Sequence, residues 1–135
     1  MNAQRSSDSV PVSSWRSARL FVTDEFAAPP VILRVDDSVI GTLGNFSAST
    51  GKAKSKKTFN VCAIVAAAMT GGTVLNYSAS LPPERRRVLY VDTEQSRFHC
   101  KRVLCRILRL AGLPTDAHPP LLEFLCLRGY AGKNG

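Results

Sequence analysis

The sequence predicts an α/β fold in which helices flank a parallel sheet. Three strand-like runs, at 39–47, 88–91 and 121–127, are rich in β-branched, aromatic or other apolar residues. Two helical patterns, at 58–69 and 97–111, lie between them. The order strand, helix, strand, helix, strand is typical of a parallel sheet with right-handed crossovers. The 135 residues suffice for one small domain, and the 44% hydrophobic and 21% charged residues are ordinary for a globular protein.

The chain divides into a polar N-terminal segment and a folded domain. Residues 1–28 begin with a serine-rich stretch, so we expect a disordered or weakly structured segment with a short helix at 17–26. Pro29–Pro30 break the chain at the start of the domain, which we place at 29–135. Within it, the weak alternation at 31–35 predicts a further strand.

The charge balance suits an anionic partner. Lys and Arg number 18 against 10 Asp and Glu, which gives a net charge of +8. Nucleotide, DNA and RNA are such partners, and a solvated basic surface without a ligand is the alternative. The longest apolar run, 61–69, is far shorter than the roughly 20 residues of a membrane span. The polar N-terminus lacks a secretory signal, and we expect a cytoplasmic protein without membrane contact.

The two predicted helices differ in their apolar pattern. The helix at 58–69 is apolar nearly all round, which predicts a buried helix, and Gly71–Gly72 follow as a stop. The helix at 97–111 is amphipathic, and Gly112 and Pro114 follow it. Its predicted apolar face consists of Cys100, Leu104, Ile107, Leu108 and Ala111. The cations off that face are Lys101, Arg102, Arg106 and Arg109.

A lysine-rich loop precedes the buried helix and resembles the phosphate-binding motif GxxxxGK[ST]. In that motif backbone N–H groups cradle phosphates, the lysine reaches the terminal phosphates, and the hydroxyl residue ligates magnesium. Lys57 and Thr58 match its end, whereas Lys56 stands where the second glycine is expected. A register on Gly51-Lys52 would leave Ala53 without a hydroxyl for the metal. The loop reads, in order, Gly51, Lys52, Ala53, Lys54, Ser55, Lys56, Lys57 and Thr58.

We expect this whole loop to bind the phosphates of ATP, with Thr58 as a ligand of Mg²⁺. Its end coincides with a helix N-terminus, which favours an anion. A solvated lysine-rich loop is the alternative. The P-loop interpretation requires strands 39–47 and 88–91 to share one parallel sheet, with the 58–69 helix packed on it.

Two carboxylates follow the second strand. Ligands of parallel sheets bind beyond the carboxyl ends of the strands, where Asp92 and Glu94 lie in the sequence. Glu94 is the candidate catalytic residue, because a carboxylate there can orient or deprotonate the water that attacks the γ-phosphate. Asp92 can help to hold magnesium through water. Alternatively, both are turn residues, and Ser96 caps the next helix.

The stretch SASTGKAKSKKTF followed by RVLYVDTEQS resembles the RecA/RepA-like ATPases of Bacteroidetes mobilizable transposons and plasmids, sometimes labelled TnpC mobilization proteins. The likeness covers roughly 31–130. It implies a RecA-like P-loop NTPase fold, ATP and Mg²⁺ as cofactors, a role in the excision, mobilization or replication of DNA, and a homo-oligomeric full-length form. The chain is also similar to replicative hexameric helicases, which implies that Glu94 is the catalytic glutamate, Lys57 the phosphate lysine and Thr58 the magnesium ligand.

The chain departs from this family in one respect. A RecA-type core needs a later apolar strand that ends in Asp, the Walker B element, and nothing after Leu127 supplies it. We therefore interpret 29–135 as the N-terminal half of a RecA-like ATPase domain, poorly active alone. The alternatives are a non-hydrolysing nucleic-acid-binding module and an inactive fragment of a longer ATPase. Candidate DNA contacts are Lys52, Lys54, Lys56, Arg85–Arg87, Arg102, Arg106 and Arg109, with no aromatic residues interleaved for base stacking.

Overall fold

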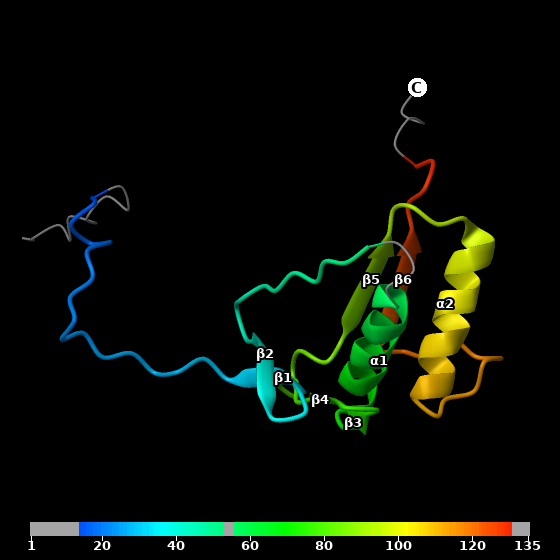
Figure 1. Cartoon of the computed structure of the whole chain (residues 1–135), viewed down its shortest axis with the longest axis horizontal. Helices are drawn as coiled ribbons and strands as arrows, with labels where there is room; N and C mark the ends of the chain where they lie inside the picture. Colours follow the sequence, from blue (N-terminus) through cyan, green and yellow to red (C-terminus); the bar gives the residue numbers. More distant parts are fainter. Residues whose placement is uncertain (1–13, 53–55, 131–135) are drawn as a thin grey trace, which may run out of the picture.

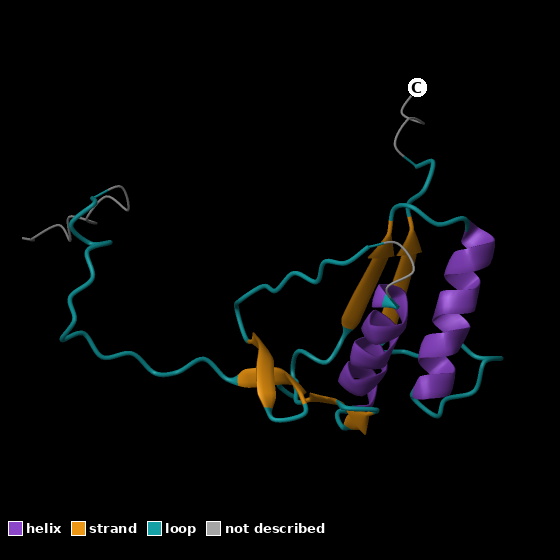
Figure 2. Cartoon of the chain, in the orientation of Figure 1, coloured by secondary structure: helices purple, strands orange, loops and turns teal. Residues whose placement is uncertain are grey.

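The fold is mixed α/β. The computed structural model describes residues 14–52 and 56–130, which contain two helices and six strands (Figures 1 and 2). In chain order these are β1 (Val31–Val35), β2 (Ser38–Thr42), α1 (Lys57–Thr70), β3 (Thr73–Val74), β4 (Tyr77–Ala79), β5 (Val88–Asp92), α2 (Arg97–Leu110) and β6 (Leu122–Cys126).

Strands β5 and β6 form a two-stranded parallel sheet, as the sequence predicts for these two runs. The register runs from Val88 opposite Leu122 to Asp92 opposite Cys126. Tyr90 and Phe124, which are partners in this register, stack their rings with centroids 4.5 Å apart and planes 12° apart. Along β5 the residues that face the helices are buried or half-buried, and Leu89 on the other face is 61% exposed.

The remaining four strands form a separate antiparallel sheet in the order β2-β1-β4-β3. The expectation that strand 39–47 lies in the parallel sheet with 88–91 is therefore wrong. A turn at Asp36, whose φ is 49°, returns the chain immediately after β1, so that β2 pairs with its neighbour in the sequence. Within the described residues, the strand–helix–strand unit that a P-loop fold requires is not formed by β2, α1 and β5.

A short hairpin follows α1. Strands β3 and β4 contain two and three residues, and Leu75 between them has a φ of 55°. Strand β4 also pairs with β1, which joins the hairpin to the N-terminal strands. Strands this short carry too little periodicity to be recognised in a sequence.

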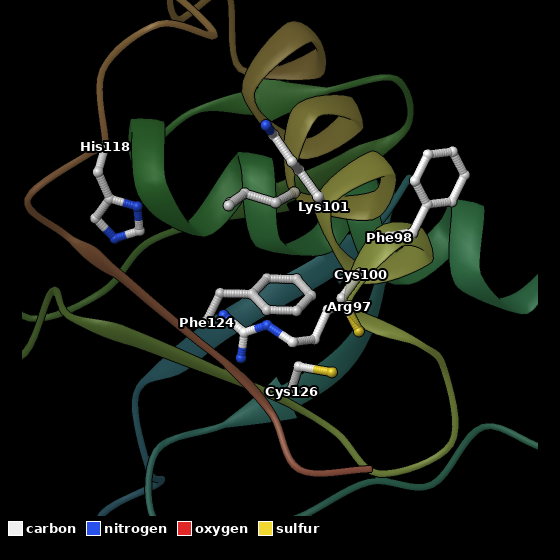
Figure 3. Close-up of a pocket in the computed structure, with 8 residues that line it drawn as sticks. Arg97, Phe98, Cys100, Lys101, His118, Phe124 and Cys126 are labelled. Carbon is white, nitrogen blue, oxygen red and sulfur yellow. The ribbon is translucent and has the colours of Figure 1, made fainter. Parts of the chain in front are cut away.

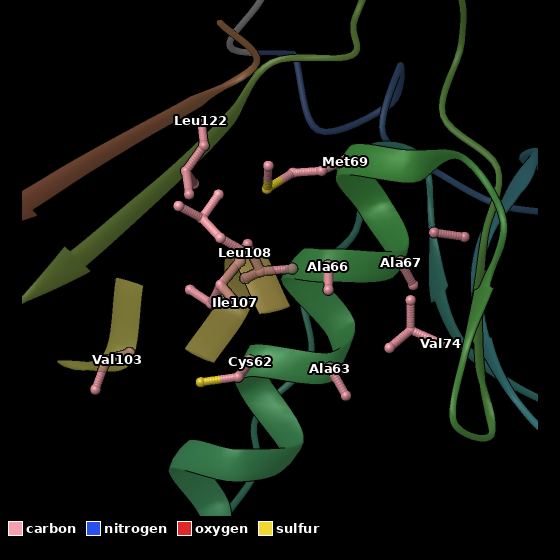
Figure 4. Close-up of a cluster of buried hydrophobic side chains, with 12 residues drawn as sticks. Cys62, Ala63, Ala66, Ala67, Met69, Val74, Val103, Ile107, Leu108 and Leu122 are labelled. Atoms are coloured by element: carbon pink, nitrogen blue, oxygen red, sulfur yellow. The ribbon is translucent and has the colours of Figure 1, made fainter. Parts of the chain in front are cut away.

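Helix α1 occupies the centre of the molecule. It packs against α2, against the β3–β4 hairpin and against β5, which explains why it is apolar on all sides (Figure 4). Its small side chains allow close approach, and Cys62, Ala63, Ala66 and Ala67 have no exposed surface. The predicted burial of this helix is confirmed.

Helix α2 is amphipathic, as predicted, and lies beside α1. Its buried residues are Cys100, Val103, Ile107 and Leu108. Ser96 is the N-cap, and its hydroxyl accepts a hydrogen bond from the His99 backbone N–H at 3.4 Å. Each helix of the described chain has 14 residues, and neither is long and apolar enough to cross a bilayer.

The segment that precedes β1 forms turns and extended backbone but no helix from residue 14 to residue 30, so the short helix predicted at 17–26 is wrong. Its apolar side chains are largely exposed: Leu20 is 72% exposed and Phe26 is 76% exposed. The Asp24 carboxylate accepts a hydrogen bond from the Phe21 backbone N–H at 2.8 Å. Such side-chain acceptors compete with helical hydrogen bonds, and short helices without tertiary contacts are marginal in water.

Candidate functional site

The candidate site lies at the end of the molecule where α1 begins and β5 ends. Helix α1 runs opposite to β5, so its N-terminus and the carboxyl ends of β5 and β6 share this end (Figure 1). Helix α1 contacts β5 directly. The lysine-rich loop and the segment that carries Glu94 therefore occupy the same end, as the sequence predicts even though β2 pairs elsewhere.

The loop brings its first and seventh residues together. The Lys57 ammonium group donates a hydrogen bond to the Gly51 backbone carbonyl oxygen. Gly51, Lys52 and Lys56 are exposed, and Thr58 is half-buried. Three predicted phosphate-binding residues, Ala53, Lys54 and Ser55, lie outside the described residues.

Lys56 adopts the left-handed conformation immediately before α1. Its φ is 59° and its ψ is 16°, a region that costs a residue with a Cβ roughly 1–2 kcal/mol and costs glycine nothing comparable. The phosphate-binding motif has glycine at this position. Lys56 therefore has a backbone conformation that favours glycine. A left-handed residue next to a helical one turns successive N–H groups toward a common point, which makes an anion-binding concavity.

The first turn of α1 has backbone N–H groups that no acceptor in the helix itself can satisfy. It has no side-chain cap and no acidic residue, and the backbone N–H of Asn60 bonds the carbonyl of Lys56 at 3.1 Å. The N–H groups of Lys57, Thr58 and Phe59 precede that bond and have no acceptor within the helix. These N–H groups and the positive end of the helix dipole favour an anion here.

Asp92 is buried at the end of β5. Its carboxylate accepts hydrogen bonds from the residues of the turn that follows it. One carboxylate oxygen accepts hydrogen bonds from the N–H groups of Glu94 at 2.9 Å and Gln95 at 2.8 Å, and the other accepts from the Gln95 amide at 2.7 Å. Burial alone would raise the pKa of Asp92, but these hydrogen bonds together lower it below its ordinary value. The geometry is that of the turn interpretation, with Ser96 as the cap of α2.

Glu94 lies in this turn. Its backbone N–H is held by Asp92, and the residue is exposed. The turn fixes the backbone from which the Glu94 carboxylate projects at the end shared with the start of α1. Positioning of a carboxylate by a rigid turn is what a general base needs, provided that a substrate reaches it.

Two residues of functional interest were missed in the sequence. Gln95 completes the Asp92 turn through both its backbone and its side chain. Phe98 is 69% exposed and extends the cationic face of α2. Helical spacing gives the signal for Phe98, because it precedes Lys101 and Arg102 by three and four residues. A shallow groove of about 600 Å³ is lined by Phe98, Lys101, Arg102, Cys105, Arg106 and Arg109.

Comparisons with known proteins supply no relative for this chain. No protein-family model matches it, and neither the curated proteins nor the solved structures contain a significant match.

Proposed function

We propose that the loop from Gly51 to Thr58 binds the triphosphate of ATP. The observation that carries the proposal is the left-handed Lys56 directly before the uncapped start of α1. This arrangement gives a concave set of N–H groups at the positive end of a helix dipole. The Lys57 side chain already reaches back to the first residue of the loop, since its ammonium group bonds the Gly51 carbonyl.

Each remaining candidate takes a role that its geometry allows. Lys57 exchanges the Gly51 carbonyl for a phosphate oxygen when ATP binds. The Thr58 hydroxyl fits Mg²⁺ as an oxygen ligand, and the metal would neutralise phosphate charge there. Asp92 is proposed to help hold the metal through water, with one of its oxygens accepting two hydrogen bonds and the other accepting one. Glu94 orients the attacking water if ATP is hydrolysed.

The RecA-like fold and a role in DNA mobilization rest on the sequence resemblance alone. The same resemblance supports a homo-oligomeric full-length form. The pairing of β2 with β1 in a separate sheet contradicts the P-loop fold, because that fold requires the strand before the loop to lie beside β5 in one parallel sheet. Phosphate binding does not depend on that arrangement, since it requires only the loop and the start of α1.

Calorimetric titration with Mg-ATP tests the proposal. Lys57→Ala should weaken binding by at least about tenfold, because a hydrogen bond to a charged group contributes roughly 1.5–3 kcal/mol. Lys52→Ala is the matched control: it removes the same charge from the same exposed loop and should weaken binding less. Equal affinity of the wild type and Lys57→Ala would refute the proposal.

A second candidate function is the binding of single-stranded nucleic acid along α2. The observation that favours it is the exposed Phe98 in the groove with four cations of that helix. Cations bind the backbone of a single strand, and an aromatic ring stacks on a base.

Fluorescence anisotropy with labelled single-stranded DNA at several salt concentrations tests this candidate. Phe98→Ala should weaken binding without changing its salt dependence, whereas Arg102→Ala with Arg109→Ala should reduce that dependence. Binding that is lost in Lys57→Ala and kept in both α2 variants would assign DNA contact to the loop and contradict the α2 proposal.

A further inference from the structure

Two cysteines that are far apart in the sequence meet at the turn after β5. Cys100 lies in the first turn of α2, and Cys126 is the last residue of β6. Both thiols donate a hydrogen bond to the carbonyl oxygen of Gln95, with sulfur–oxygen distances of 3.7 Å for Cys100 and 3.4 Å for Cys126. Figure 3 shows the two side chains lining the same pocket. Their side chains are therefore neighbours that share one acceptor.

An open pocket gives access to this pair. Its volume is about 570 Å³, and its lining includes both cysteines together with Arg97 and Lys101 (Figure 3). Cys100 is only 3% exposed, whereas Cys126 is half-buried, so a reagent in the pocket meets Cys126 more readily. The two cations favour an anionic reagent.

The two thiols differ in reactivity. Burial, and to a smaller extent the nearby Asp92 charge, raise the pKa of the Cys100 thiol to about 11. Cys100 is thus protonated at neutral pH and is a poor first nucleophile, because the thiolate is the reactive form. Because Cys126 is also the more exposed of the two in the pocket, it makes the first attack and Cys100 the second.

We propose that Cys100 and Cys126 form a reversible intramolecular disulfide by exchange with a small anionic disulfide such as oxidised glutathione. The Cys126 thiol loses its proton, and its sulfur attacks one sulfur of the reagent, which breaks the reagent's S–S bond and releases one thiol. The Cys100 thiol then loses its proton and attacks Cys126 Sγ in the mixed disulfide, which releases the second thiol. Two protein thiols are oxidised, and one reagent disulfide is reduced to two thiols.

The disulfide has a defined structural consequence. It joins the start of α2 to the end of β6 and removes two hydrogen-bond donors from the Gln95 carbonyl. Because Gln95 also holds Asp92, the oxidation state of the pair acts on the turn that carries Glu94. The inference stands on the cysteine geometry alone and is independent of nucleotide binding.

Peptide mapping after treatment with oxidised glutathione tests the inference. The purified chain is treated once folded and once in urea, its remaining thiols are alkylated, and it is digested with trypsin. Cleavage after Lys101 and Arg102 places Cys100 and Cys105 on different peptides. In the folded chain we expect the Cys100 peptide joined to the Cys126 peptide, with Cys62 and Cys105 alkylated.

Cys105→Ser is the matched control on α2 and should leave the joined peptide unchanged, whereas Cys126→Ser should abolish it. If Cys126→Ser does not fold, the peptide maps of the folded and the urea-treated wild type still show whether the folded structure selects the Cys100–Cys126 pair. The same mixture of cysteine pairs in both samples would overturn the inference. A stable glutathione adduct at Cys126 without linkage to Cys100 would also overturn it.

Discussion

The carboxylate of Asp92 accepts hydrogen bonds from both the backbone N–H and the side-chain amide of Gln95, at 2.8 and 2.7 Å. With the further bond from the Glu94 N–H, it closes the turn between β5 and α2. Asp92 thus determines where the backbone of Glu94 lies. The residue that the sequence suggests as a magnesium ligand has a structural part in positioning the candidate base.

Replacement of Asp92 should destabilise the protein. Asp92→Ala leaves three donors without their acceptor and should lower the free energy of unfolding by roughly 2–3 kcal/mol. Asp92→Asn keeps one oxygen for the two backbone N–H groups and should cost less. Urea unfolding followed by circular dichroism measures both. Equal loss in the two variants would show that the carboxylate is not acting as the acceptor of this turn.

The same carboxylate should make stability depend on pH in the acid range. The pKa of Asp92 is lower in the folded state than the ordinary value of 3.8, so its contribution is fully present above that value. The contribution is lost as the pH falls through the folded pKa, because protonation removes the charged acceptor. Urea unfolding between neutral pH and acid should show a smaller decline in Asp92→Asn than in the wild type. Identical declines would contradict this assignment.

Lys56→Gly should stabilise the protein. The left-handed backbone at Lys56 costs a residue with a Cβ more than it costs glycine, so the substitution should raise the free energy of unfolding by about 1 kcal/mol. Lys52→Gly is the control, since Lys52 does not have a positive φ and glycine should bring no gain there. Thermal and urea unfolding measure both variants. A loss of stability in Lys56→Gly would show that the left-handed conformation is not retained in solution.

The 135-residue chain should bind ATP weakly and hydrolyse it very slowly. Phosphoryl transfer depends on positioning and charge stabilisation, and an arginine finger alone contributes about 10³–10⁵ in rate in P-loop NTPases. The site offers a phosphate cradle, the Thr58 hydroxyl and one candidate base. A phosphate-release assay should show slow turnover that Glu94→Gln removes and the exposed control Glu84→Gln keeps.

Rapid turnover that is lost in Glu94→Gln would show a more complete site than we infer. Turnover unaffected by Glu94→Gln would remove Glu94 from the mechanism. Both outcomes are distinct from the expected slow, Glu94-dependent rate.

The elements that the sequence predicts correctly are those determined by local periodicity. Both helices have long apolar patterns with end signals, and β5 and β6 are compact apolar runs on either side of α2. The predicted partner of β2 is wrong although a local signal is present: only Asp36 and Asp37 separate it from β1, and a two-residue turn favours the pairing of neighbouring strands.

In the candidate site, too, some features could be predicted from the sequence and others could not. The loop and Glu94 could be located from motif spacing, and the structure brings them to one end of the molecule. The left-handed conformation of Lys56 could not be predicted, because lysine rarely adopts it and nothing in its composition signals it. The role of Gln95 depends on side-chain geometry in a turn that spacing alone leaves open.

Backbone amide NMR during titration with Mg-ATP tests phosphate binding most directly. The N–H resonances of Lys56, Lys57 and Thr58 should shift with increasing Mg-ATP, because these groups would exchange water for phosphate oxygens. Adenosine, which lacks phosphates, should not shift these three resonances. Shifts confined to the groove of α2, or resonances of the loop that do not respond to Mg-ATP, would contradict the account.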